Sequence, residues 1–477
     1  MADLVQVCEE VKHRVTPPPQ LRAEVHAKAE EIRTAVERES KKAGLKTEVR
    51  VDGSVAKDTW LRDYADVDIF MRVSPDLSKA QLRDVCLPIA KRALAPNKII
   101  ERFADHPYVE SIVRLERRGK GLRVNVVPCY DVKPGQWLSA TDRSPYHTEY
   151  IRQHLTVPQR DEVRLLKAFM RGIGAYGADI KTGGFSGMLC ETVIASQQDF
   201  VAVLNKFSNW EEANYLDLEN YFQGRSRDVH SVFREPLIVI DPVDKGRNLA
   251  AAVRREQLWN FVAACRRLLA KPTISFFAEP RIRPLTAAAY RRLLTGRGST
   301  ILALVMGRMD VVVDILWSQL YRTERAVVNL LENNDFSVIR SRSWSDEHSL
   351  NVILIELEQS VLAGSKRHGG PPVSRFAESK AFLEKHAAAK DTLSGPWIEG
   401  DRWVVLKERN RTSATALLKA SLKSGGRNVG VASEPARTFE RKVEILSGPS
   451  IGRLVAKSPE FGMVLKRFLS GRPVWLE

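Results

Sequence analysis

Two aspartates one residue apart are the side chains of this chain best suited to chemistry. Asp66 and Asp68 lie at the start of an apolar run that predicts a strand over Asp66–Val73. Because side chains on a strand alternate between its two faces, both carboxylates point one way while Val67 and Ile69 point into a core. Two carboxylates this close repel each other unless a cation lies between them. The pair therefore predicts a divalent metal site.

A Gly-Ser turn lies shortly before this pair. Gly53-Ser54 follows a predicted strand and leads into a short helical segment, so its backbone N–H groups are free to bind an anion. An Asp-x-Asp pattern alone is a weak signal, since a solvated strand end also produces it. An anion cradle beside paired carboxylates is more specific and indicates a site for a metal-bound nucleoside triphosphate. Nucleotidyl transfer needs mainly such cations and an aligned nucleophile.

The composition is that of a folded, strongly basic protein. The chain has 477 residues with 44% hydrophobic residues, enough for two to four domains, and 74 Lys+Arg against 58 Asp+Glu give a formal net charge of +16. This excess favours a polyanionic partner such as nucleic acid, although many basic proteins bind none. The sequence has no apolar run long enough to span a membrane, and its N-terminus does not resemble a secretory signal. Five cysteines without a C-x-x-C pair fit the reducing cytoplasm, where we expect the protein.

Hydrophobic periodicity and turn residues predict three domains, residues 1–150, 151–271 and 272–477. The first mixes helices and strands, the second is mostly helical, and the third contains a small sheet with helices on one face. The expected helices are Pro19–Gly44, Leu77–Leu94, one opening at Pro158, one beginning near Met188, one ending near Leu269 and Asp314–Asn333. The expected strands are Lys46–Val51, Asp66–Val73, Val109–Leu115, Leu122–Val127, Thr300–Met306, Phe336–Arg340, Val352–Leu357, Trp403–Leu406 and Val443–Ile445. We predict a turn at Asp241–Asn248 and a Gly-rich loop at Gly364–Pro372.

Seven ordered motifs follow one another along the chain. They are Gly53–Arg62 with Asp66-x-Asp68, His106-Pro107-Tyr108, Val126–Tyr130, Asp142–His147, Glu162–Lys167, Gly184–Gly187 with Leu189-Cys190-Glu191, and Asp241–Asp244 with Arg247-Asn248. They resemble the motifs of the archaeal-type (class I) CCA-adding enzymes, tRNA nucleotidyltransferases of the DNA polymerase beta-like superfamily. The resemblance implies an α+β multidomain fold. It consists of a polymerase-beta-like nucleotidyltransferase head (a mixed sheet with helices), a helical central domain, and C-terminal α/β domains with a small ferredoxin-like sheet and a tail.

The resemblance also implies roles for individual residues. Asp66, Asp68 and position 125 would be catalytic, with the two aspartates holding two Mg²⁺ ions, or Mn²⁺. The nucleotide-binding residues would be Gly53, Ser54, Lys57, His147, Lys167 and Tyr176 at the triphosphate and Arg247 at the base. An arginine suits the last role because its fork can donate to the acceptors of cytosine or adenine. Each isolated Lys, Arg, Tyr or His also has a plain interpretation as a solvated charge or a packing residue.

The implied reaction is template-independent addition of C, C and A to the 3′ end of tRNA from CTP and ATP. The implied partners are the tRNA acceptor stem and 3′ end, with no membrane and a possible homodimer. An A-form acceptor stem is bound through its shape, phosphates and 2′-hydroxyls, which calls for distributed basic residues. Candidates are Arg281, Arg283, Arg291, Arg292, Arg297, Lys419, Lys423 and Arg427. A poly(A) polymerase-like enzyme that uses ATP alone shares the turn and the aspartates and remains an alternative.

One position departs from the family pattern. The family usually carries a third carboxylate where this chain has Asn125. An amide can offer a carbonyl oxygen to a metal, but it supplies no negative charge and no general base. The enzyme therefore works with two aspartates, or another acid such as Asp131 or Glu110 substitutes, or the protein binds tRNA without catalysis. The first is favoured because the nucleotide-binding residues are all present.

Overall fold

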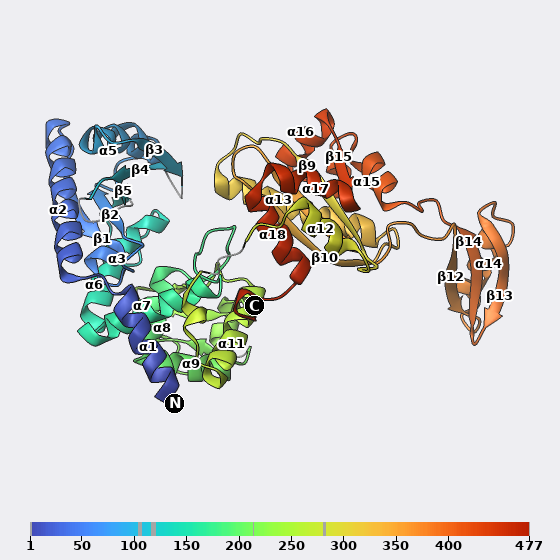
Figure 1. Cartoon of the computed structure of the whole chain (residues 1–477), viewed down its shortest axis with the longest axis horizontal. Coiled ribbons are helices and arrows are strands. Elements are labelled where there is room, and N and C mark those ends of the chain that lie inside the picture. The colour runs from blue at the N-terminus through green and yellow to red at the C-terminus, as the bar shows by residue number, and fades with distance from the viewer. Residues whose placement is uncertain (1, 104–106, 116–120, 213, 280–282, 477) are drawn as a thin grey trace. The chain divides into compact units, whose positions relative to one another are not determined.

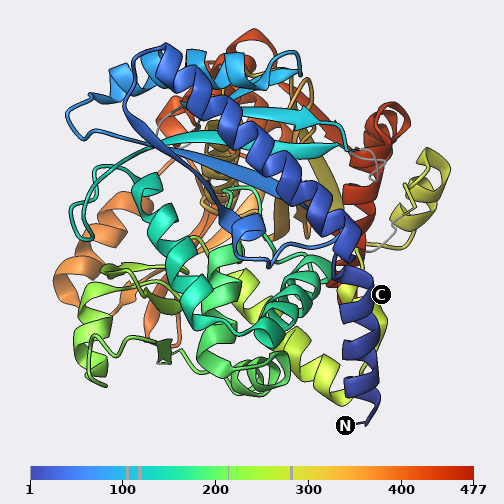
Figure 2. The ribbon, with the colours of Figure 1, turned by 90° about the vertical axis from the view of Figure 1, so that its left-hand side faces the viewer.

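A five-stranded mixed sheet carries the two aspartates. In the computed structural model its strand order is β1-β2-β5-β4-β3, with β2 parallel to β5 and the other pairs antiparallel. The elements of this part are α1 (Ala2–Val15), α2 (Pro19–Lys42), β1 (Thr47–Asp52), α3 (Gly53–Ala56), β2 (Asp66–Val73), α4 (Lys79–Gln81), α5 (Leu87–Leu94), β3 (Ile99–Phe103), β4 (Pro107–Val113) and β5 (Leu122–Tyr130). The predicted strand Asp66–Val73 is confirmed. Its Val67, Ile69 and Met71 are buried against α2 and α5, and Figure 2 shows the long blue helix α2 crossing the sheet. Asp66 and Asp68 therefore lie on the opposite face.

The structure describes residues 2–103, 107–115, 121–212, 214–279 and 283–476, and His106 and Arg281 lie outside these ranges. The chain forms two compact units, one of residues 1–281 with 472–477 and the other of residues 282–471. The first unit contains both the sheet and the following helical part. The bounds of the three domains, residues 1–150, 151–271 and 272–477, stay a prediction.

A helical part follows the sheet within the first unit. Its elements are α6 (Ser144–His154), α7 (Val157–Gly172), α8 (Gly187–Gln197), α9 (Phe200–Ser208), β6 (Tyr215–Leu216), α10 (Ser226–Val232), β7 (Ile238–Asp241), β8 (Asp244–Asn248) and α11 (Arg255–Ala270). Phe169 of α7, Phe185, Phe207 and Phe261 of α11 form an aromatic cluster in its core. The prediction of a turn over Asp241–Asn248 was wrong in extent. Only the residues between the strands turn, because Asp244–Asn248 pairs with β7 as a β-hairpin.

The second unit is built on a four-stranded antiparallel sheet of order β10-β11-β9-β15. Its elements are α12 (Ala287–Leu294), β9 (Thr300–Met306), α13 (Val313–Glu332), β10 (Val338–Ser345), β11 (Asn351–Leu357), α15 (Ala414–Leu422), α16 (Ser433–Arg441), β15 (Glu444–Ser447), α17 (Gly452–Lys457) and α18 (Pro459–Ser470). This order, with helices between β9 and β10 and between β11 and β15, is the expected ferredoxin-like arrangement. The prediction of helices on one face was wrong, because α13, α15 and α16 cover one face and α12, α17 and α18 the other. The strands are apolar on both sides, as in Ile301 and Leu302 of β9, so both faces must be buried.

A three-stranded sheet is inserted between β11 and α15, and Figure 1 shows it with α14 packed beside it. Its elements are β12 (Ser365–Pro372), α14 (Phe376–His386), β13 (Thr392–Glu399) and β14 (Arg402–Glu408). The loop predicted over Gly364–Pro372 was therefore wrong, since most of it is β12, paired with β14. Strand β12 ends in Pro371-Pro372. An edge strand tolerates these prolines because one of its sides needs no ladder hydrogen bonds.

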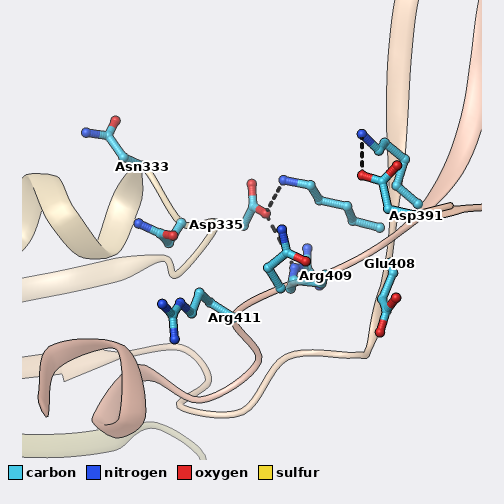
Figure 3. Close-up of a pocket in the computed structure, with 10 residues that line it drawn as sticks. Asn333, Asp335, Asp391, Glu408, Arg409 and Arg411 are labelled. Atoms are coloured by element: carbon cyan, nitrogen blue, oxygen red, sulfur yellow. Dashed lines mark hydrogen bonds and ion pairs between the residues drawn. The ribbon is translucent and has the colours of Figure 1, made fainter. Parts of the chain in front are cut away.

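Ion pairs line a polar pocket where the inserted sheet joins the ferredoxin-like part. Lys366 Nζ lies 2.9 Å and Arg409 Nε 3.4 Å from Asp335, and Lys407 Nζ lies 2.8 Å from Asp391 (Figure 3). Arg411, also on the pocket wall, is exposed.

None of the helices in the described ranges is long and apolar enough to cross a membrane. All five cysteines are buried and unbonded to one another, as expected of scattered thiols.

Candidate active site

Four polar residues form a row across the sheet, on the face opposite α2 and α5. Strand register places Asp52 of β1 beside Asp68 of β2, Asp68 beside Asn125 of β5, and Asn125 beside Glu110 of β4. Asn125 Nδ2 donates to Asp68 Oδ1 at 2.9 Å. Burial raises the pKa of Asp68 to about 6, with the charge of Asp66 adding to the effect and the Asn125 hydrogen bond opposing it. Burial disfavours the charged form of this carboxylate, and a cation bound beside it would stabilise that charged form.

Glycine is required at the turn beside this row. Gly53 has a φ of +73°, and a Cβ at this position would lie 2.2 Å from Asp68 Oδ2. A side chain would therefore both strain the backbone and displace the carboxylate. Ser54 follows in the one-turn helix α3, so the sequence prediction that the turn lies against the aspartate pair is met by the fold.

The donor atoms on this face fit a hard divalent cation. Asp66 is the more exposed aspartate, with Arg123 Nη1 3.8 Å from its Oδ2. Asn125 Oδ1 is buried without a hydrogen-bond partner among the described residues, so it is an oxygen available to a metal. Within the same ranges, no three His, Cys, Asp or Glu side chains are grouped to hold a metal ion. The site offers two carboxylates and an amide oxygen.

A buried network joins the turn to the helical part. Glu191 of α8 accepts from Lys57 Nζ at 2.5 Å, from Lys167 Nζ at 2.9 Å and from Thr59 Oγ1 at 2.5 Å. Burial alone would raise the pKa of Glu191, but the two ammonium groups outweigh it and hold the pKa at about 2. Burial lowers the pKa of Lys167, and the charge of Glu191 opposes that shift. Two ammonium groups and one carboxylate leave a net charge of +1 beside the Gly-Ser turn.

Lys167 and Tyr176 approach one point at the start of α8. A Cβ built on Gly187 would lie 3.3 Å from Tyr176 Oη and 3.6 Å from Lys167 Nζ. Burial raises the pKa of Tyr176, so its hydroxyl stays protonated and able to donate. Two other basic residues of α7, Arg164 and Arg171, have partners elsewhere. Arg164 is buried and donates to the Trp60 carbonyl, and Arg171 lies over the Tyr64 ring.

Asp241 links the remaining two predicted residues. Its buried carboxylate accepts from His147 Nε2 at 2.9 Å and from Arg247 Nη1 at 2.8 Å. Burial lowers the pKa of His147, and the hydrogen bond to Asp241 opposes that shift. A second ion pair, Arg143 to Asp244 at 2.7 Å, also holds the β7-β8 hairpin against the segment before α6. The Arg247 side chain remains 41% exposed.

Glu191, Asp241 and Asp52 were not predicted as site residues from the sequence. Glu191 and Asp241 stood inside quoted motifs, so the signal was present. Their function as counterions was not readable, because their partners are remote in the sequence. Asp52 immediately precedes the Gly-Ser turn and could have been found by extending β1 by one residue.

Family models match three successive parts of the chain. A nucleotidyltransferase domain matches residues 29–147, the second domain of tRNA nucleotidyltransferase matches residues 161–278, and the C-terminal domain of CCA-adding enzyme matches residues 297–448. The CCA-adding enzyme of Halobacterium salinarum is 35% identical over 424 residues, which cover 88% of this chain and 90% of that protein. The chain belongs to the CCA-adding enzyme family.

Other members of the family match over still more of the chain. The CCA-adding enzyme of Methanopyrus kandleri is 32% identical over 489 residues, covering 99% of this chain and 98% of that protein. The enzyme of Methanosarcina barkeri is 32% identical over 462 residues, covering 96% and 97%. The resemblance seen in the seven motifs is thereby confirmed, and the chain is a tRNA nucleotidyltransferase by family.

Proposed function

We propose that this chain adds C, C and A to the 3′ end of tRNA from CTP and ATP, releasing pyrophosphate, with Asp66 and Asp68 holding Mg²⁺. One observation carries the proposal. A chain that matches CCA-adding enzymes along nearly its whole length keeps an aspartate pair on one strand face beside a Gly-Ser turn. The family match and the metal-binding carboxylates therefore support the same reaction, nucleotidyl transfer. Cytoplasmic location and a homodimer belong to the same proposal.

The residues of the site would have two roles, binding of the charged phosphates and orientation of the base. Bound divalent ions would stabilise charge at the reacting phosphate and activate the primer hydroxyl. Ser54 and the net positive charge of the Lys57–Glu191–Lys167 network would bind the triphosphate, together with Tyr176 and His147. Asp241 fixes one edge of the Arg247 guanidinium, so the rest of the fork can donate to a cytosine or adenine edge.

The direct test is incorporation of labelled CTP and ATP into a tRNA transcript that lacks its 3′ CCA, in Mg²⁺ and separately in Mn²⁺. Ordered addition of two CMP and one AMP is expected. Incorporation of AMP alone would indicate the poly(A) polymerase-like alternative. Binding of the transcript without incorporation in either metal would favour the alternative that the protein binds tRNA without catalysis, with Asn125 in place of the third carboxylate.

Exposed basic residues of the second unit are proposed to contact tRNA phosphates. Arg291 and Arg292 of α12, with Lys419, are exposed, whereas Arg297 is held by Glu356 at 2.6 Å. Changing Arg291 and Arg292 together to alanine should weaken tRNA binding and reduce the slope of log K against log salt by about 2. Filter binding at several salt concentrations measures this slope. The matched control is the double variant Arg322→Ala/Arg325→Ala on α13, and an equal loss there would argue against a specific contact surface.

A further inference from the structure

Asp52 is a buried carboxylate that the proposed reaction does not yet use. Its side chain is 0% exposed, and within the described ranges neither of its oxygens has a hydrogen-bond partner. The nearest ion-pair partner, Arg50 Nε, lies 3.7 Å from Oδ2, beyond hydrogen-bond distance. Thr148 Oγ1 donates to the Ser144 carbonyl at 3.1 Å and accepts from the Gly53 N–H. Burial raises the pKa of Asp52, and the nearby Arg50 charge and Thr148 hydroxyl only partly oppose that shift. A buried carboxylate that has no hydrogen bond, and whose cationic partner is 3.7 Å away, is costly and calls for an explanation.

Register places Asp52 directly beside Asp68, on the side away from Asn125. Cross-strand partners of an antiparallel pair point to the same face, with Cβ atoms about 5 Å apart. Asp68 spans the gap between its two neighbours. Its Oδ1 faces Asn125, and its Oδ2 lies against Gly53, the residue after Asp52. The charge of Asp52 is also one of the causes that raise the pKa of Asp68.

Glu110 and Asp131, two other acids near the row, each accept a hydrogen bond from an arginine. Glu110 accepts from Arg102 at 3.0 Å and lies 3.9 Å from Arg123. Asp131 pairs with Arg72 at 2.5 Å and is 58% exposed. These were the two substitutes considered from the sequence, and each has a cationic partner that would compete with a metal. Asp52 alone among them lacks a hydrogen bond.

We propose that Asp52 is a positioning residue for the divalent cation. Together with Asp66 and Asp68, Asp52 on β1 supplies a third negative charge, whereas Asn125 on β5 supplies none. Asp52 acts on the metal through Asp68, its neighbour across the strands. The inference rests on the proposed function. Asp52 does not need to become a ligand, which agrees with the described residues containing no group of three acidic or imidazole side chains around one point. Cation binding would in turn relieve the repulsion between Asp52 and Asp68.

The test compares Asp52→Asn, Asn125→Asp and the double variant with the unchanged chain. Mn²⁺ binding is measured by electron paramagnetic resonance in the presence of a non-reactive CTP analogue, and the Mg²⁺ dependence of CTP incorporation is measured in parallel. Asp52→Asn should weaken Mn²⁺ binding about 10-fold or more. This is the loss of affinity expected when a residue that supports a metal ligand is replaced. Adding Asn125→Asp to that variant should restore the affinity, which a merely structural role of Asp52 would not allow.

Glu110→Gln is the matched control, because it removes a carboxylate from the other end of the same row. It should leave Mn²⁺ binding within about 3-fold of the unchanged chain. Unchanged Mn²⁺ affinity in Asp52→Asn, no rescue by Asn125→Asp, or an equal loss in Glu110→Gln would each overturn the proposal.

The single variant Asn125→Asp decides the question if Asp52→Asn does not fold. A site that already has its charge should gain less than about 3-fold in Mn²⁺ affinity, whereas a gain above about 10-fold would show that a carboxylate was missing. The metal measurement does not depend on catalysis. Failure of the unchanged chain to incorporate CTP or ATP would therefore contradict the proposed function and leave the comparison of the variants intact.

Discussion

Replacing Asp68 by asparagine should reduce incorporation of CMP and AMP on the order of 10³-fold. The change keeps the shape of the side chain and its hydrogen bond from Asn125, but removes one of the two charges that hold the metal ions. Charge stabilisation by a metal contributes several kcal/mol to a phosphoryl-type transition state, and each 1.36 kcal/mol corresponds to about tenfold in rate. Single-turnover incorporation into tRNA lacking CCA measures the loss.

The affinity for tRNA should remain nearly unchanged in this variant, because the proposed RNA contacts lie in the second unit. Asp131→Asn is the matched control, since it removes the same charge from an exposed aspartate paired with Arg72. Its incorporation rate should stay within a few-fold of that of the unchanged chain. Survival of activity in Asp68→Asn would mean that the metal site is placed wrongly.

Replacing Glu191 by glutamine should destabilise the first unit by about 3–5 kcal/mol. The change leaves Lys57 and Lys167 buried without a counterion, and breaking a buried ion pair by removing one partner costs this much. The midpoint of urea unfolding, followed by circular dichroism, measures the effect. Glu279→Gln is the control, because its pair with Arg171 is exposed and should contribute at most about 1 kcal/mol.

The same carboxylate should make stability depend on pH in the acid range. The pKa of Glu191 falls from 4.5 to about 2 in the folded state, with burial opposing the stronger effect of Lys167 and Lys57. A lowered folded pKa stabilises the fold fully above the unfolded value and progressively less as the pH falls from about 4.5 toward 2. The difference between the unchanged chain and Glu191→Gln should therefore shrink over that window. A difference that stayed constant there would contradict the assignment of Glu191 as the charged centre of the network.

Local sequence patterns predicted those strands whose apolar residues are buried in the folded structure. Asp66–Val73 and Thr300–Met306 were predicted to the residue, because each is an apolar run whose side chains are buried by the layers around it. The segment Gly364–Pro372 was misread as a loop. Glycine and proline weaken an isolated strand, yet pairing with β14 supplies the hydrogen bonds that fix it. The turn at Asp241–Asn248 failed for the same reason, since a hairpin partner is not visible in a charged segment.

The aspartate pair, the Gly-Ser turn and the order of the motifs were determined by the sequence alone, since strand alternation and turn chemistry act over a few residues. The surroundings of those groups were decided only by the tertiary structure. Glu191 neutralises Lys57 from 134 residues away. Asn125 and Asp52 reach opposite sides of Asp68 through strand register. Charge–charge effects depend on distance in space and on burial, and neither can be read from separation along the chain. The sequence therefore placed two carboxylates at the centre of the site, and the fold placed a third beside them on a different strand.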